Sequence, residues 1–258
     1  MTVPGLTVEQ NGPVLTVAFD RPERRNAMTW EMYSALYDAC EQADTQESVR
    51  LLLLTGRGGS FVSGTDIEQF SDFESGNDGV IYEGRIAEVV NRLEGVSVPT
   101  LATIDGACVG GGLVMAAACD LRVATRRSAF GMPVARSLGN CLSMNSVSLL
   151  VSRLGSSTVL DLVLRARMMC GEEALTAGFI VELCEDAEHL QRMSEETVNR
   201  LLEHAPLTMW ATKVAVGRLR SSTLPPGDDF VDQVFGSEDF RRGVEAFAAR
   251  ERAVWTGR

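Results

Sequence analysis

A chain of 258 residues with 45% hydrophobic and 23% charged residues has the composition of a soluble globular protein. Its length suits one α/β domain, or such a domain with a smaller helical part. The 24 basic and 35 acidic side chains give a net charge of −11, which argues against a general nucleic-acid binder or a protein held on anionic membranes. A single anionic ligand held by a few local arginines is still compatible with this charge.

The first part of the chain predicts strands that alternate with helices, the pattern of parallel βαβ units. Residues 14–19 (VLTVAF) are apolar and β-branched, as in a strand, and Thr29 can act as the N-cap of a following helix. Further strands are expected at residues 51–54, 100–104 and 121–124, and further helices at residues 81–93 and up to about residue 118. A long loop is expected from Gly56 to about Asn77.

From about Ser143 the sequence predicts mainly helices, with one short strand near residues 179–183. The expected helices are residues 143–154, 158–165, 172–177, 187–204, 209–219 and 229–254. No internal repeat interrupts this pattern. We interpret the chain as an α/β core over residues 1–200, followed over residues 201–258 by a helical region that packs on its own core or on another subunit.

The reactive side chains that often mark a metal or redox site are sparse. The six cysteines form no C-x-x-C pair and mostly lie in apolar segments, which predicts buried, reduced thiols. With only His189 and His204, we expect neither a His-based metal site nor a Ser-His-Asp triad. Residues 1–12 do not resemble a signal peptide, and no apolar run reaches the ~18 residues of a membrane span. A cytoplasmic protein is therefore expected.

A glycine cluster is the strongest local signal. Gly106-x-x-x-Gly110-Gly111-Gly112 follows an expected strand and opens an expected helix. It matches neither the G-x-G-x-x-G dinucleotide pattern nor a Walker A loop, which argues against a nucleotide-dependent oxidoreductase. Glycines at a helix N-terminus present unpaired N–H groups that can hold a phosphate, a carboxylate or a developing oxyanion. Tight packing of helix on sheet explains the glycines equally well.

A second segment, residues 61–67 (FVSGTDI), lies in the loop after an expected buried strand, where binding segments often occur. Gly64 allows an unusual backbone angle that turns the Thr65 N–H toward a pocket. Asp66 can cap a short helix that follows. Alone, this segment is a weak indication of a binding site; together with the glycine cluster the indication is strong.

Taken in order, the segments RPERRNAM, FVSGTDI, GACVGGGL…ACDLRVA, FGMP and LTAGFIVELC resemble the crotonase superfamily, or enoyl-CoA hydratase/isomerase family. The resemblance covers essentially the whole chain. It implies an α/β fold, a spiral of ββα units with a helical C-terminal trimerisation region, and assembly into a homotrimer or hexamer. It also implies an enzyme of fatty acid metabolism that binds an acyl-CoA or enoyl-CoA, with coenzyme A as part of the substrate and no separate cofactor or metal.

The resemblance assigns roles to particular residues. The backbone N–H groups of Thr65 and Gly111 match the oxyanion hole that stabilises a thioester enolate. The positions that match coenzyme A contacts are Arg24, Arg25, Ser63, Asp66, Ile67, Phe247 and Arg250. For each arginine, a solvated surface charge is an equally good interpretation.

The chain departs from the family where hydratases carry two glutamates. Val114 occupies the first position and Val134 the second, and no Asp or Glu occurs from Met132 to Arg153. Asn140 and Ser143 are polar residues near the place where isomerases carry an acid, and either can only orient water. Asp66 and Glu68 are weaker candidates for a base.

Two hypotheses follow. In the first, the protein is an enoyl-CoA hydratase/isomerase-like lyase or isomerase that acts on the α and β carbons of an acyl-CoA. In the second, it binds acyl-CoA without turnover, since both glutamates are replaced by valine. The sequence reveals neither the acyl chain nor the pathway.

Overall fold

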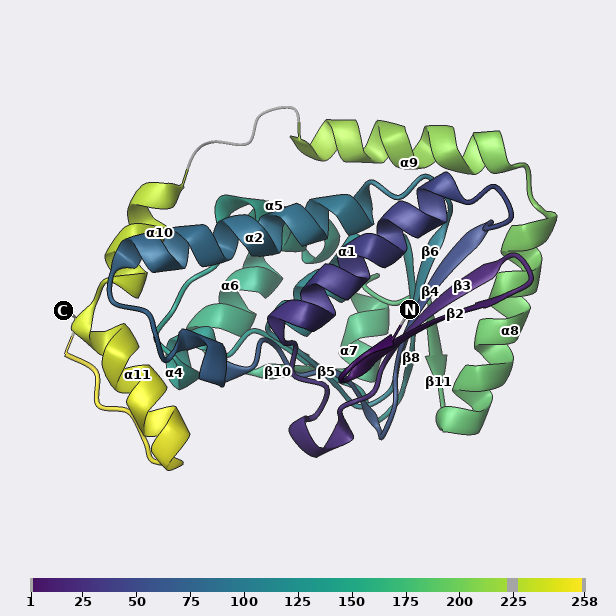
Figure 1. The fold of residues 1–258 in the computed structure, drawn as a ribbon. Coiled ribbons are helices and arrows are strands. Elements are labelled where there is room, and N and C mark those ends of the chain that lie inside the picture. Colours follow the sequence, from purple (N-terminus) through teal and green to yellow (C-terminus); the bar gives the residue numbers. More distant parts are fainter. Residues whose placement is uncertain (1, 222–226, 257–258) are drawn as a thin grey trace.

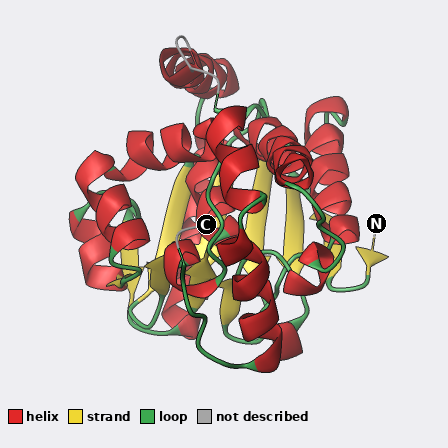
Figure 2. Cartoon of the chain, turned by 90° about the vertical axis from the view of Figure 1, so that its left-hand side faces the viewer, coloured by secondary structure: helices red, strands yellow, loops and turns green. Residues whose placement is uncertain are grey.

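The computed structural model describes residues 2–221 and 227–256, and within them seven strands form the main sheet. The strand order is β1 (Thr2–Val3), β2 (Leu6–Asn11), β3 (Val14–Phe19), β4 (Leu51–Gly56), β6 (Thr100–Ile104), β8 (Leu121–Thr125) and β11 (Glu182–Cys184). The strands pair antiparallel from β1 to β3 and parallel from β3 onward. Every residue of β6 is buried, because helices cover the parallel part of the sheet on both faces (Figure 2).

A second sheet of four short strands turns away from the first. Its order is β10 (Met168–Cys170), β9 (Ala129–Gly131), β7 (Ala107–Val109) and β5 (Ser60–Val62). The consecutive pairs β4–β5, β6–β7 and β8–β9 each give one strand to either sheet, and helices follow each pair. The chain is therefore a spiral of ββα units, which confirms the predicted fold class. The predicted long loop from Gly56 to Asn77 missed β5, whereas the 3-10 helix η2 (Ile67–Phe70), with the Asp66 side chain accepting from Glu68 N, is the short helix predicted after Asp66.

The helices surround the sheets and supply most of the core. Their bounds are α1 (Trp30–Thr45), α2 (Gly76–Glu94), α3 (Gly111–Ala118), α4 (Val134–Ser137), α5 (Met144–Leu154), α6 (Ser156–Leu164), α7 (Gly171–Thr176), α8 (Ala187–Glu203), α9 (Pro206–Ser221), α10 (Asp228–Phe235) and α11 (Glu238–Ala249), with the 3-10 helix η1 at Pro22–Arg24. The Thr29 hydroxyl accepts a hydrogen bond from Met32 N at 3.4 Å, which confirms the predicted N-cap of α1. α3 is buried almost throughout and packs between β5 and α5.

The C-terminal helices divide into two parts. α9 lies along one side of the molecule (top of Figure 1), where Lys213 bonds to Asp120 and Arg220 to Glu94. α10 folds back against α2, α11 packs against α10 and η2, and Phe235 and Phe240 are buried there. The prediction of one helix over residues 229–254 was wrong, since the chain breaks at Gly236 and Ser237 and α11 ends at Arg250 in a left-handed conformation. A domain boundary at residue 200 stays a prediction.

No single helix of the described residues is long and apolar enough to cross a membrane. Only α5 and α6 taken together, which meet at an angle of 119°, reach that length and composition.

Candidate active site

The FVSGTDI segment and the glycine cluster come together at one end of the second sheet. β5 and β7 are parallel neighbours, so the loops that follow them leave the sheet side by side. A Cβ atom placed on Gly110 would lie 3.5 Å from Gly64 Cα, and one on Gly111 would lie 3.9 Å from the same atom. Gly64 and Gly110 have φ angles of +99° and +58°, which glycine adopts without strain. The close approach of two distant segments thus depends on these glycines.

Two backbone N–H groups are left unpaired at this junction. Within the described residues, no hydrogen-bond acceptor lies on the N–H of Thr65 or of Gly111, although both residues line the same cavity. Gly111 is the first residue of α3, so its N–H is one of those a helix cannot pair internally. The flanking peptides are fixed, since Met28 N bonds to Gly64 O at 2.8 Å and Asp66 N to Met28 O at 2.9 Å.

The next glycine of the cluster has a packing role. A Cβ atom on Gly112 would lie only 2.2 Å from Val62 O, so α3 can approach β5 only without a side chain there. The two interpretations of the cluster therefore apply to different residues: Gly111 faces the cavity, and Gly112 packs the helix against the sheet.

The hydroxyl groups of Tyr33, Thr65 and Tyr82 form a chain with Thr65 in the middle. Thr65 Oγ1 lies 2.8 Å from Tyr33 Oη and 2.7 Å from Tyr82 Oη. Burial raises the pKa of both tyrosines above the ordinary value, with the Thr65 hydrogen bond acting in the opposite direction. Both phenols are therefore neutral at physiological pH and hold the Thr65 side chain from α1 and α2.

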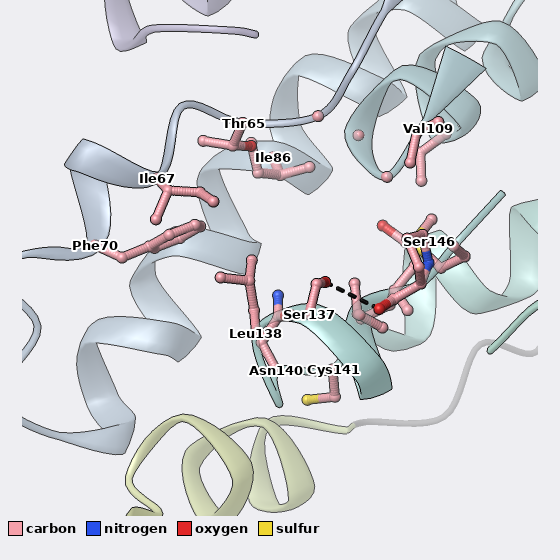
Figure 3. A pocket seen from close by; sticks show the side chains of 18 of the residues that line it. Thr65, Ile67, Phe70, Ile86, Val109, Ser137, Leu138, Asn140, Cys141 and Ser146 are labelled. Atoms are coloured by element: carbon pink, nitrogen blue, oxygen red, sulfur yellow. Dashed lines mark hydrogen bonds between the residues drawn. The ribbon is translucent and has the colours of Figure 1, made fainter. Parts of the chain in front are cut away.

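The cavity beside these N–H groups has a volume of about 190 Å³ and mostly apolar walls. Figure 3 shows Thr65 and Ile86 on one side, facing Ser137, Leu138, Asn140 and Cys141 on the other. Val114 from α3 and Val134 from α4 both line the cavity and are nearly fully buried. Asn140 Oδ1 is buried and has no hydrogen-bond partner among the described residues.

Sequence reasoning missed Glu83, the one carboxylate among the described residues that line the cavity. It is 7% exposed and comes from α2. Its Oε2 accepts a hydrogen bond of 2.7 Å from the backbone N–H of Ser143, the N-cap residue of α5. A signal was available: Glu83 interrupts the apolar stripe of α2, between Tyr82 and Ile86.

The residues matched to coenzyme A contacts lie in different settings. Ser63, Ile67 and Phe247 line the cavity, whereas Asp66 caps η2 and pairs with Arg21 at 2.5 Å. Arg24 and Arg25 are exposed. Their backbone carbonyls accept hydrogen bonds from Ser63, whose N–H bonds to Arg25 O at 3.1 Å and whose hydroxyl bonds to Arg24 O.

Arg24 also pairs with the exposed Glu68 at 3.1 Å, while Arg250 is exposed at the end of α11. Ser143 lies outside the cavity lining and bonds to two residues of it, Glu83 and Ser146. The coenzyme A assignments stay predictions.

Comparisons with known proteins agree with this architecture. The family model described as "Enoyl-CoA hydratase/isomerase" matches residues 9–258. A probable mitochondrial enoyl-CoA hydratase of Arabidopsis thaliana is 27% identical over 95% of this chain and 82% of that protein. The solved structure of an enoyl-CoA hydratase/carnithine racemase from Magnetospirillum magneticum has a TM-score of 0.81 with 26% identity, covering 100% of this chain and 97% of that one.

A methylmalonyl-CoA decarboxylase, solved in complex with 2S-carboxypropyl-CoA, has a TM-score of 0.90 at 22% identity and complete coverage of both chains, a likeness of fold. The chain belongs to the enoyl-CoA hydratase/isomerase family, that is, to the crotonase superfamily.

Proposed function

We propose that this protein binds an acyl-CoA or enoyl-CoA thioester in the cavity and polarises the thioester carbonyl with the N–H groups of Thr65 and Gly111. The observation that carries the proposal is the pair of unpaired N–H groups at the cavity wall. Fixed donors at a mostly apolar cavity wall stabilise a developing enolate oxygen better than water does, and the N-terminus of α3 adds its dipole. In hydrolytic enzymes the loss of one such donor costs about 2.7–4 kcal/mol.

The coenzyme A part would leave the cavity past Ser63 and Ile67. Arg25 bonds to Ser63 through its backbone, Phe247 of α11 lines the cavity, and Arg250 follows the end of α11. Exposed arginines near the cavity fit a ligand that carries phosphates, because arginine forms charge-assisted hydrogen bonds with phosphate oxygens. The chain as a whole is acidic, so this positive charge is local. Local arginines of this kind would let a chain of net charge −11 hold an anionic ligand.

The valines limit the chemistry that this site performs. Val114 and Val134 lie at the positions that match the family's two glutamates, and neither can activate water. General acid–base help of that kind is worth about 10²–10⁴-fold. Asn140, with its unpaired buried oxygen, is the better placed of the two predicted polar substitutes, since Ser143 lies outside the lining.

A second candidate function is acyl-CoA binding without turnover, and the apolar walls formed by Val114 and Val134 favour it. Titration calorimetry with acyl-CoAs of increasing chain length tests both functions, which each require binding; no binding at any length would contradict both. Hydration of crotonyl-CoA, followed by the loss of its conjugated-enoyl absorbance, then separates them. Rapid hydration by the wild-type protein would exclude the binding-only function.

Assembly into a homotrimer or hexamer and a cytoplasmic location stay predictions. The exposed apolar residues of α9, Leu207, Trp210 and Leu219, are compatible with a contact to another subunit. Sedimentation velocity of the purified protein measures the assembly directly.

A further inference from the structure

Glu83 is a buried acid at the cavity wall. It lies on the face of α2 that also buries Tyr82, Ile86 and Val90. An ionised carboxylate is strongly disfavoured in such surroundings unless hydrogen bonds or a cation compensate. Among the described residues no lysine, arginine or histidine pairs with Glu83, so the compensation comes from hydrogen bonds alone.

Ser143 supplies that compensation. Its backbone N–H lies 2.7 Å from Glu83 Oε2 and belongs to the N-terminus of α5, whose dipole favours a negative charge. Burial raises the pKa of Glu83 to about 7, and the backbone and hydroxyl hydrogen bonds of Ser143 limit the rise. The group therefore exchanges protons within the physiological range.

Glu83 is also close, along the chain, to the groups that surround the unpaired N–H pair. The preceding residue, Tyr82, holds the Thr65 hydroxyl at 2.7 Å, and Tyr33 at the other end of the hydroxyl chain lies 2.9 Å from a Cβ atom built on Gly111. Glu83, Thr65 and Gly111 all line one cavity. Tyr82 of α2 and Tyr33 of α1 thus hold the Thr65 side chain, and Glu83, next to Tyr82, lines the same cavity as the two N–H donors.

We propose that Glu83 is the general base of this site and removes a proton from the α carbon of the bound thioester. This inference rests on the proposed function, since the thioester oxygen must lie at the N–H groups of Thr65 and Gly111. The C–H electron pair becomes the Cα–C1 double bond, and the carbonyl π pair moves to the thioester oxygen. The proton stays on the Glu83 carboxyl and returns to the α carbon or to a conjugated γ carbon.

A single base of this kind defines the class of reaction. It suits α-proton exchange and double-bond migration, in which one group takes a proton and gives it back. Hydration needs a second group to activate water, and Val114 and Val134 cannot supply it. The substrate class is therefore an acyl-CoA with a hydrogen on its α carbon.

The test follows hydrogen exchange at the α carbon of butyryl-CoA in D₂O by mass spectrometry. The variant Glu83→Gln keeps the shape and an acceptor for Ser143 N–H. Glu88→Gln is the control, because it removes the same charge from the exposed side of the same helix. We expect wild-type exchange in the control and about 10²–10⁴-fold slower exchange in Glu83→Gln. Butyryl-CoA affinity, measured by calorimetry, should change less than about threefold, which is a small free-energy difference.

The pH dependence gives a readout that a purely structural carboxylate would not produce. Wild-type exchange should rise through about pH 7 and then level off, since only the ionised form of Glu83 accepts a proton. The titratable groups that lie near enough to feel the charge of Glu83 are Tyr33, Tyr82 and Cys141, and burial raises the pKa of each, for Cys141 to about 12. None of them titrates near neutral pH.

A second variant tests the assignment without altering Glu83. Ser143 has a φ angle of −62°, which proline adopts, so Ser143→Pro removes the N–H donor, together with the hydroxyl that accepts from Ser146 N at 3.4 Å. Loss of the hydrogen bond to Glu83 should move the exchange midpoint upward by about one pH unit. An unchanged midpoint would overturn the proposal even if Glu83→Gln failed to fold.

The outcomes are distinct. Slow exchange in Glu83→Gln with retained binding supports the inference. Wild-type rates in Glu83→Gln, or no exchange in a wild-type protein that binds butyryl-CoA, overturn it and leave the binding function intact. No binding of butyryl-CoA or of longer acyl-CoAs contradicts the proposed function and this inference together.

Discussion

At the scale of single residues, the protonation of Glu83 links the site to the stability of the fold. Burial raises its pKa to about 7, so between about pH 4.5 and pH 7 the folded chain holds a proton that the unfolded chain has lost. The stability that Glu83 contributes is complete below that window and is lost as the pH rises through it. Above pH 7 its ionised carboxylate opposes folding.

We therefore expect Glu83→Gln to be more stable than the wild-type protein at pH 8, by up to about 3 kcal/mol, and nearly equal to it at pH 4.5. Urea unfolding at the two pH values measures the difference, with Glu88→Gln as the control for a lost exposed charge. An equal difference at both pH values would mean that the Glu83 carboxyl is not desolvated in the folded state.

At the scale of elements, the N-terminus of α3 sets the geometry of the site. Gly112 lets the helix approach β5, and a Cβ atom there would meet Val62 O at 2.2 Å. Gly84, in the exposed middle of α2, has no atom within 4 Å of its Cβ position. Gly112 therefore has no room for a side chain, whereas Gly84 has room for one.

Gly112→Ala should destabilise the protein by about 1–3 kcal/mol through overpacking and weaken acyl-CoA binding, because α3 carries the Gly111 N–H. Gly84→Ala should stabilise by about 1 kcal/mol, since alanine favours the helix. Thermal unfolding and calorimetry of both variants test this pair. If Gly112→Ala matched the wild-type protein in both measurements, the packing role assigned to Gly112 would be excluded.

The sequence predicted long elements better than short ones. β3, β4, β6 and β8 were found because runs of apolar, β-branched residues mark them, and α5 to α9 because their apolar residues recur at helical spacing. The three-residue strands β5, β7, β9 and β10 are too short to show a period, and they form because neighbouring turns of the spiral pair with them. The break at Gly236 was missed because apolar spacing continues on both sides of it.

The candidate site shows a similar division. The pairing of Thr65 with Gly111 followed from the resemblance to the family, which the motifs of both loops carry. Glu83 carries no motif, and its partner Ser143 is 60 residues away in the chain, so only the folded packing of α2 against the start of α5 brings them together. Sequence patterns predict elements, whereas pairings of this kind depend on tertiary contacts.

At the scale of the whole molecule, the C-terminal helices close the fold onto its own core. Phe235 of α10 lies among Phe73, Tyr82 and Phe240, with a ring-centre distance of 4.8 Å to Phe240. α11, which follows, places Phe247 at the cavity. The cavity wall therefore depends on the seating of α10 against α2.

Phe235→Ala should loosen this contact, because truncating a buried phenylalanine costs about 3–5 kcal/mol. Hydrogen–deuterium exchange should speed up in α10, α11 and the first turns of α2, and acyl-CoA affinity should fall. Leu164→Ala, at a side chain that is 72% exposed, is the control and should change neither. Wild-type exchange rates in α10 and α11 of Phe235→Ala would show that these helices do not rely on Phe235.

The central claim concerns where the thioester oxygen binds. A crystal structure of the protein with a non-reactive acyl-CoA analogue measures this directly. We predict the thioester oxygen at about 2.7–3.1 Å from both the Thr65 and the Gly111 nitrogen, with the α carbon facing the Glu83 carboxyl. A thioester bound elsewhere in the molecule, or an oxygen in contact with neither nitrogen, would contradict the account.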